Sequence, residues 1–403
     1  MHLHRSLVGS LCARIQYRPA SSPGATIFRS AAVCEHQPQP SAVPTRCGWV
    51  FDHIRAPFRL RLLGLVGYHF TMTVLEVIQK SAEYLAKKGL ESPRLQVELL
   101  LAHALKIPRL NLYLDFERGL SDAEIADVRQ MVKRRGRREP LQHILGSTSF
   151  CGLEMRVTPA VLVPRPETEL LAERAWRFLC IRQASSNMHP DTEPTPEPLP
   201  GRGAERGTAD QSSPPGRGAG VGSFVENLAQ NESVAPAVLD FGTGSGCLAV
   251  SIAVNAPAAR VWALEISEAA LEVATQNAAL HHVSDRIQFV QGDGIAALPA
   301  GIQFDLIVSN PPYIASREID SLQPEVRDHD PRIALDGGED GLNFFRAFAA
   351  QAKTFLRPSG KLMAEFGDGQ EQAIERLFRD RGWLIEAVGR DYAGRPRILV
   401  AQP

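Results

Sequence analysis

Apolar residues recur at helical spacing from Thr73 onward. Five of these positions share one face of a helix: Val74, Leu75, Ile78, Ala82 and Leu85. Gly89 follows the run, where a glycine commonly ends a helix because it adopts a left-handed backbone without steric cost. The pattern therefore predicts an amphipathic helix between Thr73 and Gly89.

Two more helices are predicted downstream. Ser92 and Pro93 occupy the N-cap and first-turn positions of an apolar run that a later proline stops. A third helix begins at Ser121, which forms a capping-box pattern with Glu124 three residues later, and runs to about residue 135. Together these segments predict a small helical domain over residues 72–138, whose pattern by itself indicates packing and no chemistry.

The middle of the chain changes character twice. Residues 139–168 show short strand-like alternation and turn residues, which predict a β-hairpin connector. A helix is predicted from about Glu169 to Ile181. Residues 184–234 are rich in Pro, Gly, Ser and Thr and hold too few apolar side chains to form a core, so we predict a disordered insertion there.

Strand-like and helix-like segments alternate after residue 235. Apolar strands are predicted at 237–240, 260–265, 287–291, 305–309 and 361–366. This rhythm is typical of a doubly wound, mainly parallel α/β sheet. Two further strands, 384–388 and 398–401, predict a closing C-terminal hairpin. We therefore predict one Rossmann-like domain over residues 169–403, interrupted by the insertion.

The first 71 residues differ from the rest of the chain. They hold eight arginines, no lysine and only two acidic residues, Glu35 and Asp52. One interpretation is an Arg-rich transit peptide, which would direct the protein to the mitochondrion. We favour an upstream extension of a gene whose natural start is Met72, because the segment is long for a transit peptide. In either case we expect it to be poorly ordered and without a catalytic role.

Composition excludes several classes of protein. The apolar share of 44% and the charged share of 22% are typical of globular proteins, and a net charge of −1 argues against stable nucleic-acid binding. Six cysteines without CxxC spacing predict neither a metal site nor disulfides and suit a reducing compartment. No apolar stretch reaches the roughly 18 to 20 residues of a membrane span. We expect a cytoplasmic monomer.

Basic side chains gather at the predicted end of the third helix: Lys133, Arg134, Arg135, Arg137 and Arg138. Two interpretations stay open. The cluster could meet an acidic partner or RNA, or it could be a solvated helix end whose charge complements the helix dipole.

A glycine-rich turn joins the first strand of the α/β domain to an apolar helix. Its residues are Gly242, Thr243, Gly244, Ser245 and Gly246. Alternate glycines let the backbone bend sharply and approach a ligand, and the helix N-terminus offers free amide donors. We predict a cofactor-binding turn, although glycine turns also serve dinucleotide folds and purely structural bends.

Two further strand ends carry acidic residues toward this turn. Glu265 closes the second strand, where its carboxylate can accept hydrogen bonds from both hydroxyls of a ribose. This feature does not separate a nicotinamide cofactor from S-adenosylmethionine. Asp293 and Gly294 end the third strand, where the carboxylate could accept from an adenine amino group. The alternatives are a surface strand end and a plain Asp-Gly turn.

The sequence Asn310-Pro311-Pro312-Tyr313 follows an apolar strand at its carboxyl end, where open α/β sheets place their sites. A planar amide nitrogen needs two aimed acceptors before it can attack a sulfonium methyl group. The Asn310 side-chain oxygen and the Pro311 carbonyl could bind its two N–H groups and orient it. The prolines stiffen the corner, and Tyr313 could stack on the substrate. A rigid turn without function is the alternative.

The glycine turn, the run from Pro164 to Glu169 and the Asn-Pro-Pro-Tyr corner together resemble the HemK/PrmC family, the release factor glutamine N5-methyltransferases. Further segments match the same family: Glu139-Pro140 with Gly146, Asp336-Gly337-Gly338, Asp340-Gly341-Leu342, Glu365-Phe366-Gly367, and Arg390-Asp391 with Gly394-Arg395-Pro396-Arg397. The resemblance covers about residues 73–403, and neither the extension nor the insertion interrupts a motif.

The resemblance implies a class I methyltransferase fold with a helical N-terminal domain that docks a peptide chain release factor. It implies S-adenosyl-L-methionine bound along the glycine turn and beside Asn310. The methyl group would pass to the side-chain nitrogen (N5) of the glutamine in a Gly-Gly-Gln loop. By the same resemblance, Arg165, Pro166, Glu167 and Thr168 lie beside the cofactor pocket.

Two other functions stay open. Nucleic-acid methyltransferases that act on adenine or cytosine amino groups use a similar corner on an extruded base. The compact helical front end and the lack of a basic, aromatic-rich recognition domain argue against this function. A non-catalytic binding module could also keep the fold, but Asn310 and Glu265 argue for an enzyme.

Overall fold

The computed structural model describes residues 71–186 and 235–403 of the chain. The predictions for the N-terminal extension up to residue 70, and for the insertion beyond residue 186, lie outside the described residues. Within the described ranges, no helix combines the length and apolar character needed to cross a membrane.

Residues 72–138 form the predicted helical domain. Its helices are α1 (Val74–Lys87), α2 (Pro93–Leu105), the 3-10 helix η1 (Arg109–Tyr113) and α3 (Asp122–Gly136). The predicted capping box between Ser121 and Glu124 is present, and an equivalent box joins Thr73 and Glu76 at the start of α1. Ser92 precedes α2 as predicted, but its backbone is left-handed and its side chain makes no capping hydrogen bond.

The helical domain has an apolar core of its own. Six of its large side chains are fully buried: Leu85, Val97, Leu100, Leu101, Leu112 and Leu120. Each such side chain contributes about 1.5 to 3 kcal/mol through burial. The same core includes Ile144, so it extends beyond the predicted boundary at residue 138. The sequence did not predict η1, because five residues of 3-10 helix are too few to establish a period.

The basic cluster at the end of α3 is largely paired within the chain. Arg135 is buried, and one of its Nη atoms lies 2.9 Å from a carboxylate oxygen of Glu325, while Arg138 lies 2.8 Å from the other oxygen. Arg134 pairs with Glu139 at 2.5 Å. Three of the five basic side chains therefore have partners within the chain, while Lys133, Arg134 and Arg137 are exposed at or just after the end of α3, so both interpretations of the cluster stay predictions.

A short helix and a hairpin follow the helical domain along the chain. They are α4 (Leu141–Leu145), β1 (Ser147–Phe150) and β2 (Leu153–Arg156). The predicted hairpin is present as an antiparallel pair, with Cys151 and Gly152 both at positive φ in its two-residue turn. The prediction of strands and turns alone was wrong at α4, because a helix of five residues is too short to show a helical period.

Helix α5 (Pro166–Ser186) begins three residues before its predicted start and ends five residues after its predicted end at Ile181. The predicted start of the disordered insertion at residue 184 was therefore wrong, because residues 184–186 still belong to the helix. Proline at the first helical position already has the required φ, and the carboxylates of Glu167 and Glu169 interact favourably with the positive end of the helix dipole. The boundary predicted between the connector and the α/β domain, at Thr168, therefore falls inside this helix.

Seven strands of the described chain form one sheet in the order β5-β4-β3-β6-β7-β9-β8. Their bounds are β3 (Ala237–Phe241), β4 (Arg260–Glu265), β5 (Ile287–Gln291), β6 (Phe304–Ser309), β7 (Leu356–Glu365), β8 (Leu384–Arg390) and β9 (Pro396–Gln402). Neighbouring strands from β5 to β7 are parallel, whereas β9 runs antiparallel to both β7 and β8. The predicted parallel sheet and closing hairpin are confirmed.

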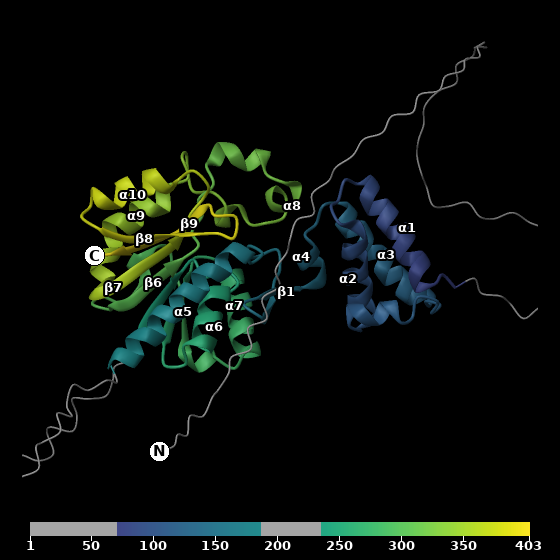
Figure 1. The fold of residues 1–403 in the computed structure, drawn as a ribbon, viewed down its shortest axis with the longest axis horizontal. Helices are drawn as coiled ribbons and strands as arrows, with labels where there is room; N and C mark the ends of the chain where they lie inside the picture. Colours follow the sequence, from purple (N-terminus) through teal and green to yellow (C-terminus); the bar gives the residue numbers. More distant parts are fainter. Residues whose placement is uncertain (1–70, 187–234) are drawn as a thin grey trace, which may run out of the picture. The chain divides into compact units, whose positions relative to one another are not determined.

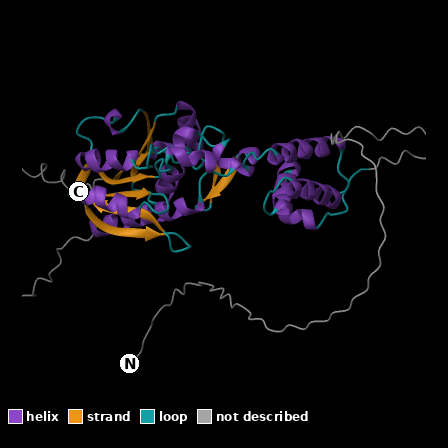
Figure 2. Ribbon diagram, turned by 90° about the horizontal axis from the view of Figure 1, so that it is seen from above, coloured by secondary structure: helices purple, strands orange, loops and turns teal. Residues whose placement is uncertain are grey.

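Helices cover both faces of this sheet (Figure 1). Helices α5, α6 (Cys247–Asn255) and α7 (Glu268–Leu280) lie on one face, and α9 (Asn343–Gln351) and α10 (Glu371–Arg379) lie on the other, so that the strands run between two helical layers (Figure 2). Successive residues of β3 serve the two cores in turn, because strand side chains alternate. The shorter elements are η2 (Ser284–Arg286), η3 (Ile295–Ala297), η4 (Ser316–Ser321), α8 (Pro324–Arg327), η5 (Arg332–Ala334) and η6 (Ala352–Phe355).

The strand order changes direction between β3 and β6. From β3 the chain proceeds to β4 and β5 and then returns to β6 on the opposite side of β3. Connections that diverge in this way leave a crevice at the carboxyl ends of the two central strands. The glycine turn follows β3, and Asn310 follows β6, so the topology brings the two predicted site segments to the same crevice.

Candidate active site

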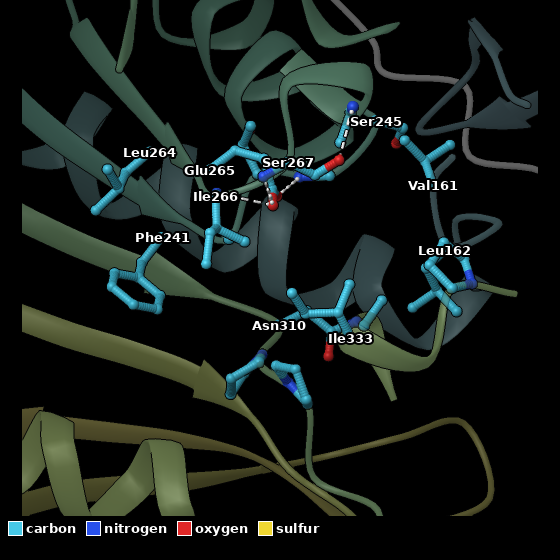
Figure 3. Close-up of a pocket in the computed structure, with 18 of the residues that line it drawn as sticks. Val161, Leu162, Phe241, Ser245, Leu264, Glu265, Ile266, Ser267, Asn310 and Ile333 are labelled. Carbon is cyan, nitrogen blue, oxygen red and sulfur yellow. Dashed lines mark hydrogen bonds between the residues drawn. The ribbon is translucent and has the colours of Figure 1, made fainter. Parts of the chain in front are cut away.

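A pocket of about 220 Å³ occupies this crevice. Its walls are the glycine turn, the ends of β4 and β5, the corner after β6 and residues 160–168. Figure 3 shows Glu265 and Asn310 on opposite sides of the pocket, with Phe241 on one flank and Leu162 on the other. The site is therefore built from segments that lie far apart in the sequence.

Most of the predicted site residues line this pocket. They are Arg165, Thr168, Gly242, Thr243, Gly244, Ser245, Glu265, Asp293, Gly294, Asn310, Pro311 and Pro312. Pro166, Glu167, Gly246 and Tyr313, which were also predicted, are not among the lining residues. The sequence reasoning missed an apolar wall made by Phe241, Leu264, Ile266 and Phe344, because apolar residues near strand ends give no signal that separates a pocket from a core.

The three glycines of the turn have two different structural roles. Gly242, Gly244 and Gly246 all have positive φ, at 70°, 54° and 78°. A Cβ atom added to Gly242 or Gly244 would meet nothing within 4 Å, so these positions need glycine for its backbone conformation. A Cβ added to Gly246 would lie 3.0 Å from the Cβ of Ala274, so this glycine also allows α6 to approach α7.

Asp240, the next-to-last residue of β3, stabilises the glycine turn through its side chain. One oxygen of its fully buried carboxylate accepts a hydrogen bond from the Thr243 hydroxyl at 2.6 Å and another from the Ala249 amide at 3.0 Å. Burial raises the pKa of Asp240 to about 7, although both hydrogen bonds oppose the shift. The sequence placed Asp240 before the turn, but no local pattern indicated that its side chain would bind the turn.

Backbone amides bind the Glu265 carboxylate and fix its orientation. Its oxygens accept hydrogen bonds from the amides of Gly244, Ile266 and Ser267 at 2.9, 3.0 and 3.1 Å, as the dashed lines in Figure 3 indicate in part. A carboxylate has about four acceptor positions, so capacity remains for a ligand in the pocket. The bond to Gly244 also links the end of β4 to the glycine turn, which fixes one wall of the site.

The Asn-Pro-Pro-Tyr corner begins directly after β6, whose six residues are all buried. The Asn310 side-chain nitrogen, Nδ2, donates a hydrogen bond to Thr168 Oγ1 at 3.0 Å. The side-chain oxygen of Asn310 takes no part in this hydrogen bond. Asn310 and Pro311 both line the pocket. The corner therefore offers the pocket a side-chain amide oxygen whose nitrogen is already engaged.

A glycine-rich segment braces the corner from behind. The amide of Ile314 donates to Leu335 O at 3.0 Å, and the amide of Gly337 donates back to Ile314 O at 2.8 Å. A Cβ on Gly337 would lie 2.8 Å from the carbonyl oxygen of Pro312, and one on Gly341 would collide with that of Tyr313. These contacts account for the matching Asp-Gly-Gly and Asp-Gly-Leu segments of the sequence, since only glycine allows the two backbones to approach so closely.

Comparison with known proteins gives matches along both folded parts of the chain. The family description "PrmC N-terminal domain" matches residues 76–146, and "Methyltransferase small domain" matches residues 218–325. A release factor glutamine methyltransferase of Geobacter sulfurreducens is 38% identical over 81% of this chain and 95% of its own length. The chain belongs to the release factor glutamine methyltransferase family. A second member, from Chlorobaculum tepidum, is 37% identical over 76% of this chain and 89% of that protein.

A protein with a different description also matches. A bifunctional methyltransferase of Rickettsia felis is 33% identical over 82% of this chain, which covers 58% of that longer protein. The family membership confirms the predicted class I methyltransferase fold with its helical N-terminal region and C-terminal hairpin. It also makes the chain a methyltransferase, as predicted from the corner and the turn.

Two predicted site residues, Tyr313 and Glu167, do not line the pocket. The Tyr313 hydroxyl points to Glu365, with 3.4 Å between Tyr313 OH and Glu365 Oε1, and burial raises the pKa of Tyr313. Glu167 lies in the first turn of α5 without lining the pocket. The stacking role predicted for Tyr313 and the cofactor role predicted for Glu167 stay predictions.

Arg165 lines the pocket and is held by an acidic partner. Its guanidinium lies 2.8 Å from Asp330 Oδ2, which connects the segment before α5 to the loop after α8. Burial raises the pKa of Asp330 to about 6, against the opposing charge of Arg165. Among the described residues, no group of three His, Cys, Asp or Glu side chains could hold a metal ion.

Proposed function

We propose that this protein transfers a methyl group from S-adenosyl-L-methionine to the N5 side-chain nitrogen of the glutamine in the Gly-Gly-Gln motif of peptide chain release factors. Relatives named release factor glutamine methyltransferase at 38%, 37% and 35% identity support the substrate. The observation that carries the chemistry is the Asn310 side chain, whose nitrogen is bound to Thr168 while its oxygen remains for a substrate N–H.

The residues present fit the proposed cofactor. Gly242 and Gly244 leave open space where side chains would otherwise stand, so the backbone of the turn is accessible from the pocket. Glu265 has acceptor capacity for ribose hydroxyls, and Asp293 lies at the end of β5 where it could accept from an adenine amino group. The apolar wall around Phe241 suits a flat aromatic ring. When bound, S-adenosyl-L-methionine supplies a methyl group activated by its sulfonium.

The Asn-Pro-Pro-Tyr corner offers two hydrogen-bond acceptors to the amide nitrogen of a carboxamide substrate. An amide nitrogen is a poor nucleophile because its lone pair is delocalised, and it carries two N–H donors. The Asn310 side-chain oxygen and the Pro311 carbonyl provide two acceptors on a stiff loop, which orient the nitrogen and stabilise positive charge as it develops there. The bracing contacts of Gly337 and Gly341 keep these acceptors aimed, so little reorganisation is needed during reaction.

The helical domain is the proposed docking element for the release factor. Two of its large apolar side chains are strongly exposed: Leu110 at 70% and Leu114 at 81%. They lie four residues apart at η1, on the domain that matches the PrmC N-terminal description. Single exposed apolar side chains are common on protein surfaces, so the docking role depends on whether these two leucines act together as one contact.

One competition experiment tests the proposed substrate. The full chain is incubated with S-adenosyl-L-methionine labelled in its methyl group, a recombinant release factor and duplex DNA, and the label is mapped by mass spectrometry. We expect the label on the glutamine of the Gly-Gly-Gln motif, and none on a release factor in which that glutamine is alanine. Label on adenine or cytosine amino groups, with none on the release factor, would refute the proposed function in favour of the nucleic-acid alternative.

A further inference from the structure

Glu365 is a buried carboxylate that the chemistry described so far does not use. It ends β7, is 2% exposed and does not line the pocket. Its oxygen Oε2 lies 2.7 Å from Thr168 Oγ1, and its oxygen Oε1 lies 3.4 Å from the Tyr313 hydroxyl. Burial disfavours the charged form of a carboxylate, and the hydrogen bonds from Thr168 and Tyr313 offset part of that cost.

Thr168 joins this carboxylate to the reaction corner. It lies in the first turn of α5, is 2% exposed, and its single hydroxyl contacts both Glu365 Oε2 and Asn310 Nδ2, the latter at 3.0 Å. Three elements of the fold therefore meet in one chain of hydrogen bonds: the end of β7, the start of α5 and the corner after β6. Thr168 lies 142 positions from Asn310 and 197 positions from Glu365 in the sequence. We call this chain of hydrogen bonds the ladder.

The direction of these hydrogen bonds follows from the donors available. An ionised carboxylate has only acceptors, and a hydroxyl has one proton. Thr168 therefore donates to Glu365 and can only accept from its other neighbour. Asn310 must then present its NH2 group to Thr168, and its oxygen is turned to the opposite side. A flipped Asn310 would place an acceptor against Thr168, which has no second proton to give, and would leave the bond unmade.

We propose that Glu365 and Thr168 are positioning residues that set the orientation of the Asn310 amide, so that an oxygen rather than an NH2 group meets the substrate. The inference rests on the proposed role of Asn310 as an acceptor for the glutamine amide. With the opposite orientation, two NH2 groups would face each other, and the substrate nitrogen would lose one of its two acceptors.

The protonation state of Glu365 adds a second readout. Burial raises the pKa of Glu365 to about 7, the bonds from Thr168 and Tyr313 oppose the shift, and two charged side chains also act on it: Glu167 raises the pKa and Arg397 lowers it. A protonated Glu365 can donate to Thr168, which releases the Thr168 proton toward Asn310 and removes the constraint on its amide. Activity should therefore rise with pH around 7 when the ladder controls orientation.

The decisive variant is Glu365→Gln, which keeps the shape but adds a donor at every pH. We expect kcat to fall by about 10²-fold, the size of effect that misplacing an aimed group produces, while KM for S-adenosyl-L-methionine stays within about twofold. The rise of kcat around pH 7 should disappear. Glu272→Gln, at an exposed position of α7 outside the pocket, is the matched control and should behave as the wild type.

Thr168 variants distinguish a hydrogen-bond ladder from simple packing. Thr168→Val removes the hydroxyl at constant shape and should lower kcat as Glu365→Gln does, whereas Thr168→Ser should restore most of it. The double variant Thr168→Val with Glu365→Gln should be no slower than Thr168→Val alone, because both changes cut the same ladder. Binding of S-adenosyl-L-methionine, measured by calorimetry, and the melting temperature establish that each variant is folded.

Three results would overturn the positioning role. They are a folded Glu365→Gln enzyme with wild-type kcat, strictly additive losses in the double variant, or an unchanged pH profile in Glu365→Gln. A wild-type enzyme that leaves the release factor glutamine unmethylated would instead refute the proposed function, so the two ideas fail by different measurements.

Discussion

Replacing Asn310 by alanine removes the side-chain acceptor on which the proposed chemistry depends. The loss has two parts that differ in size. In the folded protein, Asn310→Ala gives up one part-buried hydrogen bond, to Thr168, which contributes about 0.5 to 1.5 kcal/mol to stability. In the transition state it gives up one of the two acceptors that stabilise charge on the substrate nitrogen, and loss of one such aimed group raises the barrier by about 3 to 4 kcal/mol. We therefore expect kcat to fall by about 10² to 10³ with little loss of folded protein.

The assay follows methyl transfer from labelled S-adenosyl-L-methionine to a recombinant release factor at saturating concentrations of both. Calorimetric titration with S-adenosyl-L-methionine separates catalysis from cofactor binding, which should change little because Glu265 and the glycine turn are intact. Asn255→Ala is a matched control, since it also removes one side-chain amide bond, to Ser251 O at 2.9 Å, at the exposed end of α6. Wild-type turnover in Asn310→Ala would remove this residue from the mechanism and, with it, the ladder through Thr168.

Three further predictions concern packing, docking and pH. Gly246→Ala should lower the free energy of unfolding by about 2 to 4 kcal/mol in denaturant titrations, because this position combines a positive φ with a Cβ that would lie 3.0 Å from Ala274. Gly301→Ala, at φ 81° with no atom near the added Cβ, should cost only about 1 kcal/mol. Equal losses in the two variants would contradict the packing role of Gly246. Leu110→Ser with Leu114→Ser should raise KM for the intact release factor by about tenfold and leave methylation of a short Gly-Gly-Gln peptide unchanged; an unchanged KM would dismiss docking at η1. The folded-state pKa of Glu365 is raised from 4.5 to about 7, so its contribution to stability is complete below pH 4.5 and is lost as pH rises through 7. Relative to Glu365→Gln, the free energy of unfolding of the wild type should fall by up to about 3 kcal/mol between pH 5 and 8. Parallel curves of stability against pH for the two proteins would refute the pKa shift.

Two strands of the sheet could be predicted to the residue, whereas β7 begins five residues before the predicted start at residue 361. The strands at 260–265 and 287–291 have the predicted limits, since apolar runs that end at turn residues leave little choice of boundary. The capping box at Ser121 was equally clear, because it depends on two residues three positions apart. These features are local, so the sequence alone specifies them.

Features that depend on distant contacts could not be predicted in this way. Glu365 appears in the sequence only as the end of an apolar strand, and nothing near it indicates that its carboxylate will meet Thr168 from α5. The same holds for Arg135, which looks like a solvated helix end until Glu325 lies beside it. In each case the partner is brought in by the fold over more than a hundred residues, and periodicity carries no information about such pairs.

Strand topology and long-range hydrogen bonds fix different parts of the site's geometry. The glycine turn and the corner lie at the ends of neighbouring strands, so the switch in strand order is sufficient to bring them to one crevice. Topology cannot decide which end of an amide faces the pocket, because the two ends of the Asn310 side chain have nearly the same shape. That choice requires a donor and acceptor pattern, and a buried carboxylate imposes one when it is ionised, since it can then only accept. The cost of burying Glu365 is then the cost of orienting Asn310, and a fold that placed an apolar residue at this position would gain stability while losing the aim of its acceptor.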